Sequence, residues 1–175
     1  MKFFSSMMLG ALVLLSSTTG FALGFERYVE GVHYTKVDQA EVAPGAVVEF
    51  FSYGCPHCAH LEPALEQWLK QKPASVKFAR IPAGWNPRFG FLARVYYGLE
   101  AIGQAEKLSQ PLFDHLHKEQ KPLANLEDAV AFVRTHGGDT KTFEAAFNSD
   151  ATNEAVEKGN VIYARYQVRG VPALL

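Results

Sequence analysis

The chain has 175 residues, of which 48% are hydrophobic and 20% are charged, and its net charge is −1. This length and mixture are typical of a globular protein with one domain, whose core can form without structural disulfides. So small a net charge argues against nucleic acid as a partner, and we expect none.

Residues 1–24 have the pattern of a secretory signal peptide. Lys2 precedes an apolar run from Met7 to Leu15, and small residues follow it. The apolar run is too short to span a bilayer. Cleavage fits after Ala22 or after Gly24, and the alternative interpretation is a short buried N-terminal helix. Export would bring the protein into an oxidising compartment, where thiols tend to form disulfides.

Residues 25–85 predict a strand, helix and strand unit. A weak alternation predicts a short edge strand at 33–37. Residues 44–53 run apolar, with β-branched and aromatic side chains, and predict a central buried strand. An amphipathic helix follows at 55–72, and residues 75–83 predict a second central strand. We therefore expect the two central strands to be parallel, with the helix as their crossover.

Residues 86–166 carry only helical signals and predict an all-helical insertion. Asn125 is the expected cap of one helix, which ends at Gly137 and Gly138, and Pro111 is the expected kink or break of another. Residues 167–175 again predict a strand. The helical stretches are residues 88–103, 105–120, 125–138, 139–149 and 150–168.

The only two cysteines, Cys55 and Cys58, could in principle serve several chemistries. Covalent haem attachment needs a histidine directly after the second cysteine, where this chain has Ala59. A structural zinc site needs about four ligands, and His57 or His60 would supply only a third. A purely structural disulfide would close a loop too small to stabilise the fold much.

A redox couple accounts for every local feature. Cys55 falls at the start of a helix, where unpaired N–H groups and the helix dipole favour the thiolate. Cys58 follows one turn further on and could act as the resolving thiol. Pro56 stiffens the turn, and His57 adds positive potential beside the first sulfur. Because a stabilised thiolate favours the reduced form, the disulfide form would be an oxidant of other proteins.

Glu49 interrupts the apolar strand that leads to the cysteines. Alternation places Glu49 on one face of that strand with Phe51 and Tyr53. It could be an exposed carboxylate at the strand end. We favour a buried, unpaired carboxylate with a raised pKa, which exchanges protons with Cys58 through water.

Two segments carry a resemblance to a known family. The stretches VVEFFSYGCPHC (47–58) and VRGVPAL (168–174), with EGVHYTKV (30–37) and FEAAFNS (143–149), resemble the DsbA family of periplasmic thiol–disulfide oxidoreductases. The resemblance spans nearly all of residues 26–175. It implies an α/β protein with a thioredoxin fold, into which a helical domain is inserted after the second central strand, and it implies a periplasmic location.

The resemblance also implies roles for individual residues. Cys55 would attack and form the mixed disulfide, Cys58 would resolve it, and His57 would be the main stabiliser of the thiolate. Glu49 would be the buried acid. A cis peptide bond is implied between Val171 and Pro172, packed against the disulfide, and the Val171 backbone would bind an extended substrate segment as a short strand.

The function that follows is a dithiol oxidase acting on reduced, unfolded exported proteins. Its redox-active disulfide would need no cofactor and no metal, a membrane partner resembling DsbB and linked to quinone would reoxidise it, and we expect a monomer. A disulfide reductase or isomerase, or a non-catalytic binding module on the thioredoxin scaffold, are the alternatives. The family continues past Gly-Val-Pro, so we expect a fold truncated before its last strands and C-terminal helix.

Overall fold

The computed structural model describes residues 28–37 and 45–175, so the predicted signal peptide lies outside the described residues. The chain divides into two compact units, Met1–Lys36 and Val37–Leu175. In the first unit, Gly31 donates its N–H to the Tyr34 carbonyl at 2.8 Å and adopts a φ of 80°, which suits glycine. The edge strand predicted at 33–37 is therefore wrong, because the chain reverses there in a turn.

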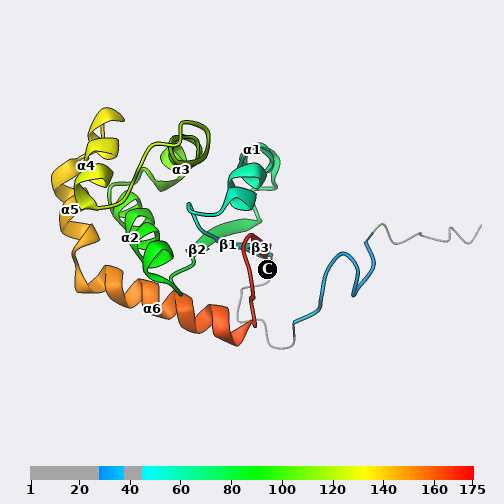
Figure 1. Ribbon diagram of the computed structural model, residues 1–175. Helices are drawn as coiled ribbons and strands as arrows, with labels where there is room; N and C mark the ends of the chain where they lie inside the picture. The colour runs from blue at the N-terminus through cyan, green and yellow to red at the C-terminus, as the bar shows by residue number, and fades with distance from the viewer. Residues whose placement is uncertain (1–27, 38–44) are drawn as a thin grey trace, which may run out of the picture. The chain divides into compact units, whose positions relative to one another are not determined.

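The second unit is built on a sheet with the order β2-β1-β3 (Figure 1). Strand β1 (Ala46–Phe51) pairs in parallel with β2 (Lys77–Pro82), which confirms the predicted parallel unit. The short strand β3 (Ala173–Leu174) pairs antiparallel with the other side of β1. The return to strand chemistry at the end of the sequence is thus confirmed.

Strand β2 is not central in the described sheet, so that part of the expectation for residues 75–83 is wrong. Only β1 has a described strand on both sides. The β2 side chains of Lys77 and Ala79 are exposed, whereas the last four residues of β1 are all buried. Ile81 of β2 packs against the cluster under α6, and Phe78 on the other face of the strand packs against Trp68 of α1.

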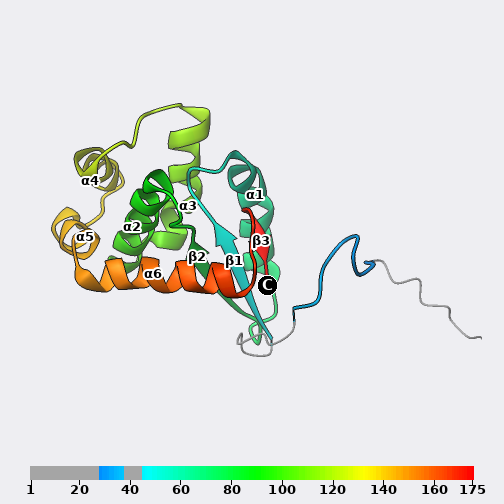
Figure 2. The same cartoon turned by 60° about the horizontal axis from the view of Figure 1, so that its bottom comes forward.

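Helix α1 (Pro56–Gln71) makes the crossover between the parallel strands, as predicted. Its N-cap residue is Cys55, with an extended backbone, and Pro56 occupies the first helical position. Helix α1 and the long helix α6 (Asp150–Arg165) lie on opposite sides of the sheet (Figure 2). The cysteines therefore stand where the sheet meets the start of α1.

The predicted helices between the two parts of the sheet are confirmed. Asn125 caps its helix by accepting the N–H of Asp128 at 3.0 Å. The expected break at Pro111 is displaced, because the helix runs past this proline and changes to a π-helix at Asp114. The elements are α2 (Pro87–Ala101), α3 (Ala105–Phe113), η1 (Asp114–Lys118), α4 (Leu126–Thr135) and α5 (Thr140–Phe147), followed by α6.

Two apolar clusters meet at β1, and its alternation decides which residue enters which. Phe51 and Tyr53 belong to the cluster shared with the helical insertion. Val48 and Phe50 belong to the cluster under α6, where Phe50 packs edge-on against Tyr163 at 4.9 Å. The predicted faces of β1 are thus confirmed. Within the described residues, no helix has both the length and the apolar character needed to cross a bilayer.

Candidate active site

A short turn joins β1 to α1 and carries the first cysteine. The Cys55 N–H donates to the Ser52 carbonyl at 3.0 Å, and the Gly54 N–H donates to Ser52 Oγ at 3.2 Å. Gly54 lies against α2, where an added Cβ would come within 3.0 Å of Leu92 Cδ1. The turn is therefore closed by its own hydrogen bonds and packed on one side.

Both cysteines are free thiols in this structure, and they differ in access to solvent. Cys55 is 7% exposed and Cys58 is 0% exposed. Burial raises the pKa of the Cys58 thiol far above its usual range, and the neighbouring Cys55 and Glu49 raise it further against the opposing effect of a Ser52 backbone hydrogen bond. Cys58 therefore holds its proton, and Cys55 is the less buried of the two residues.

The cysteine turn meets a segment from the other end of the chain. Cys55 Sγ donates a hydrogen bond to the Val171 carbonyl at 3.3 Å. The Val171–Pro172 peptide bond is cis, as the resemblance implies, and β3 begins at the next residue. Val171 also packs against both apolar clusters. The two motifs on which the resemblance rests are therefore joined in space.

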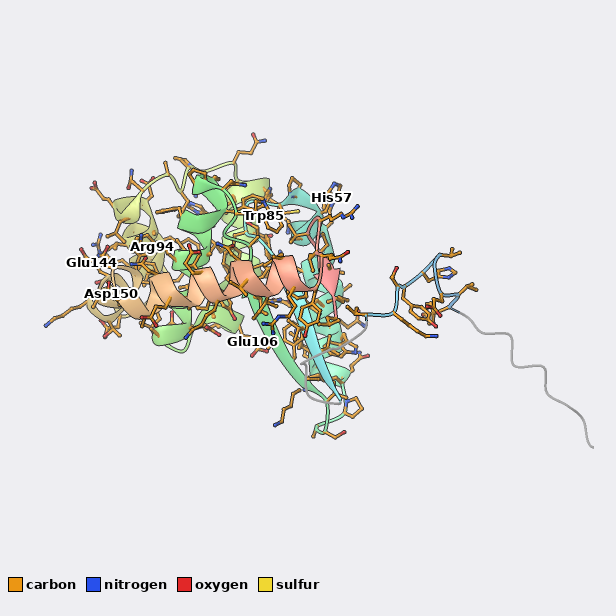
Figure 3. All side chains as sticks on the ribbon, turned by 90° about the horizontal axis from the view of Figure 1, so that it is seen from below. His57, Trp85, Arg94, Glu106, Glu144 and Asp150 are labelled. Carbon is orange, nitrogen blue, oxygen red and sulfur yellow. The ribbon has the colours of Figure 1, made fainter. Side chains whose placement is uncertain are left out.

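The two residues between the cysteines lie on the surface. Pro56 and His57 are both exposed on the first turn of α1. Figure 3 labels His57 at the start of this helix, on the outside of the molecule, and Arg94, Glu144 and Asp150 at the far end of the helical insertion. His57 is thus available beside the Cys55 turn.

Glu49 is buried as expected, but it is not unpaired. Its Oε2 accepts the Nε–H of Arg80 at 2.7 Å. The same guanidinium donates through Nη2 to Glu62 Oε2 and through Nη1 to Ser109 Oγ, each at 2.7 Å. The register of the parallel strands sets Glu49 directly beside Arg80, which is why the expectation of an unpaired carboxylate is wrong.

This buried cluster contains two carboxylates and one guanidinium. Burial raises the pKa of Glu49 to about 7, with Arg80 opposing the shift and Glu62 adding to it. The Oε1 atoms of both glutamates are buried and have no hydrogen-bond partner among the described residues. Glu49 can consequently take up and release a proton near neutral pH.

Sequence reasoning missed four residues of this region. Arg80 bonds Glu49, and Glu62 and Ser109 accept from the same guanidinium. His117 places its Nε2 2.7 Å from the Tyr53 carbonyl. The sequence offered a signal for Arg80, because Arg80 and Lys77 are the charged residues of a strand predicted to pair with the strand of Glu49. No local signal marks His117, which comes from the helical insertion.

Comparisons with known proteins agree with this geometry. Residues 90–175 match the family described as DSBA-like thioredoxin domain. The chain is 32% identical over 174 residues to the thiol:disulfide interchange protein DsbA of Pseudomonas aeruginosa, covering 97% of this chain and 82% of that protein. It is 34% identical over 184 residues to the protein of that name from Azotobacter vinelandii, covering 97% and 83%.

Solved structures are similar in the same way. The crystal structure of Pseudomonas aeruginosa DsbA has a TM-score of 0.70 at 36% identity, covering 76% of this chain and 70% of that one. A cysteine-to-serine variant of Proteus mirabilis DsbA, in complex with the non-covalently bound peptide PWATCDS, has a TM-score of 0.72 at 26% identity, covering 85% and 81%. The thioredoxin-like fold with a helical insertion is shared with these proteins.

Proposed function

The chain belongs to the DsbA family of thiol:disulfide oxidoreductases, and on that premise we propose that Cys55 and Cys58 form its redox-active disulfide. The protein is an enzyme of thiol–disulfide exchange. Its family works through a disulfide within the chain and without a bound cofactor. The hydrogen bond from Cys55 Sγ to the Val171 carbonyl is the observation that carries this assignment, because it joins the cysteine turn to the cis-proline segment.

The reaction begins with the oxidised protein. A thiolate of the client attacks Cys55 Sγ, the bond between Cys55 and Cys58 breaks, and Cys58 leaves with the electron pair. A second client thiolate then attacks the client sulfur of the mixed disulfide, and Cys55 leaves as a thiolate. The client loses two electrons and gains a disulfide, while the protein pair is reduced. The greater exposure of Cys55 supports this order of roles.

The leaving Cys58 sulfur needs a proton, and Glu49 is the proposed donor. The pKa of Glu49 is raised to about 7, so it carries a proton for part of the time at neutral pH. Its charge is among the causes that raise the pKa of Cys58, which supports their proximity. A water molecule would carry the proton from the carboxyl to the thiolate.

Cys58 needs a proton, whereas Cys55 needs a stabilised thiolate, because it is then the better leaving group. As the N-cap of α1, Cys55 lies at the positive end of the helix dipole, which favours its thiolate. Pro56 fixes the first turn, and the exposed His57 adds positive potential when it is protonated. We assign Pro56 and His57 the role of tuning the reduction potential of the cysteine pair.

The client segment is proposed to lie along the cis-proline segment. Val171 presents its carbonyl to the Cys55 sulfur, so an extended peptide bound to the Val171 backbone would bring its own cysteine to that point. A cysteine-to-serine variant of the related Proteus mirabilis protein binds, non-covalently, a peptide that contains a cysteine. Pro172 would hold this backbone in its present direction.

Proposals on location, clients, reoxidation and oligomeric state go with this function. We propose that residues 1–24 direct export to the periplasm, that clients are reduced, unfolded exported proteins, and that a DsbB-like quinone-linked membrane protein restores the disulfide. We also propose that the monomer is the active form. The division into residues 25–85, an insertion at 86–166 and a return at 167–175 fits the order of the described elements.

Trapping the mixed disulfide tests the assignment. A Cys58→Ser variant, mixed with a peptide that carries an activated disulfide, should retain the peptide on Cys55, as peptide mapping by mass spectrometry would reveal. The matched Cys55→Ala variant should form no adduct and should not oxidise a peptide dithiol. An adduct on Cys55→Ala with none on Cys58→Ser, or peptide oxidation by Cys55→Ala, would overturn the roles given to the two cysteines.

The alternatives are separated by equilibrium with glutathione. An oxidase should have a potential well above that of thioredoxin, which is about −270 mV. A potential near that of thioredoxin would favour the reductase or isomerase. A binding module would keep its partners in the Cys55→Ala variant and show no turnover in the wild-type protein.

A further inference from the structure

His117 reaches the active-site turn from a distant part of the chain. It lies on the π-helix η1 of the helical insertion, and its Nε2 is 2.7 Å from the Tyr53 carbonyl. Tyr53 immediately precedes Gly54 and Cys55. The imidazole thus contacts the backbone of the turn that carries the reactive sulfur.

The hydrogen bond fixes the tautomer of this histidine. A carbonyl oxygen can only accept, so Nε2 must carry the proton and donate it. The imidazole ring also packs near Phe113, with ring centroids 6.2 Å apart. His117 is half-buried; the hydrogen bond sets its tautomer, and the bond and the Phe113 ring together orient the imidazole.

Two neighbouring carbonyls at the turn are already paired. The Phe51 carbonyl accepts the Ala83 N–H at 2.7 Å, and the Ser52 carbonyl accepts the Cys55 N–H at 3.0 Å. Tyr53 is 1% exposed and lies beyond the end of β1, so its carbonyl lacks a partner in the sheet. A buried carbonyl needs a partner, and His117 is the one that the structure supplies.

The turn is consequently held from two sides. Gly54 packs against Leu92 of α2, and Tyr53 is bonded to His117 of η1. Cys55 Sγ also contacts the Val171 carbonyl, and this contact depends on the position of the turn. A turn released on the His117 side could shift, and the sulfur would then lose its alignment with Val171.

We propose that His117 is a positioning residue, which donates a hydrogen bond to the Tyr53 carbonyl and thereby sets the place of Cys55. The π-helix explains how it can do so, because the wider turn at Asp114–Lys118 changes the direction of the side chains that follow α3. The effect of this positioning on catalysis rests on the proposed function. The helical insertion thus contributes directly to the geometry of the redox site.

Three variants separate the hydrogen bond from the packing. His117→Phe keeps a ring of similar size and removes the donor. His117→Gln keeps a donor close to the position of Nε2. His115→Phe is the matched control, because His115 lies on the same π-helix and contacts Pro122 and Phe132 of the insertion.

The readout is the rate at which iodoacetamide alkylates Cys55 in the reduced protein, followed by mass spectrometry. We expect His117→Phe to change this rate about fivefold or more, the size of one net hydrogen bond, while His117→Gln and His115→Phe stay within about twofold of wild type. An unchanged rate in His117→Phe, or an equal change in His117→Gln, would overturn the proposal. Peptide oxidation by the same variants should follow the same order.

This experiment distinguishes the two proposals. A wild-type protein that oxidises no peptide would remove the proposed function, while the alkylation series would still decide the role of His117. Should His117→Phe fail to fold, nitrogen NMR of the wild-type imidazole gives a direct answer. A proton on Nε2 supports the proposal, and a neutral ring with its proton on Nδ1 contradicts it.

Discussion

Arg80 donates its Nε–H to Glu49 at 2.7 Å across the two parallel strands. Both side chains lie in the core, almost wholly shielded from solvent. The buried Glu49 carboxylate therefore has a partner of opposite charge. Glu62 competes for the same guanidinium. The proton balance of this cluster is therefore coupled to the stability of the fold.

Glu49→Gln should flatten the pH dependence of stability. The pKa of Glu49 is raised from 4.5 to about 7, so the folded protein binds a proton that the unfolded chain has released between these values. Stability from this group is present at low pH and is lost as the pH rises through that window, by up to about 3 kcal/mol. Urea unfolding measured from pH 4.5 to pH 8 checks this.

The matched control for that series is Glu154→Gln, an exposed carboxylate on α6. Its profile should follow that of the wild-type protein. If Glu49→Gln kept the wild-type slope between pH 4.5 and pH 7, the assignment of this proton to Glu49 would be wrong.

Arg80→Met should destabilise the protein strongly at neutral pH. The substitution leaves two buried carboxylates without their cation, and breaking a buried ion pair in this way costs about 3–5 kcal/mol. The loss should shrink on acidification, because the carboxyls then become neutral. Chemical unfolding followed by far-UV circular dichroism measures it.

Two further variants sharpen the result for Arg80. Arg80→Lys retains the charge but cannot reproduce the three bonds of the guanidinium, so its stability should lie between those of wild type and Arg80→Met. Arg134→Met removes an exposed arginine of α4 and should cost less than about 0.5 kcal/mol. Equal losses in Arg80→Met and Arg134→Met would contradict a stabilising role for the buried cluster.

Alkylation of the reduced protein should be selective for one cysteine. Cys58 is 0% exposed and burial raises the pKa of its thiol, so only Cys55 should react with iodoacetamide in the folded protein. Mass spectrometry should find one adduct. In Cys55→Ala the folded protein should remain unlabelled, and unfolding in guanidinium chloride should expose Cys58 to labelling. Comparable labelling of both cysteines in the folded wild type would refute the difference in access.

The local features of the site could be predicted from the sequence. The apolar strand, the helix start at Pro56 and the spacing of the cysteines all act within one short stretch of chain. The alternation of β1 also gave the correct faces for Glu49 and Phe51. Such features follow from short-range geometry, which is why they can be read without a structure.

The partners of these residues could not be predicted. The contact of Glu49 with Arg80 depends on the register of β1 and β2, and that of Tyr53 with His117 depends on how the insertion packs. Pairing between distant segments is fixed by tertiary packing and leaves no periodic signal. The cis bond before Pro172 was accessible only through the family resemblance, since the dipeptide alone suggests a turn.

Gly98 and Gly90 on α2 offer a last test, of how tightly the insertion is packed. A Cβ at Gly98 would lie 2.6 Å from Phe143 Cε2 of α5, so Gly98→Ala should lower stability by about 1–3 kcal/mol through overpacking. A Cβ at Gly90 meets its nearest atom, the Gly84 carbonyl, at 3.6 Å, an ordinary contact. Gly90→Ala should therefore be neutral or stabilise by up to about 1 kcal/mol through helix propensity. Thermal unfolding of both variants checks the pair, and the reverse order of their melting temperatures would refute the close contact of α2 with α5.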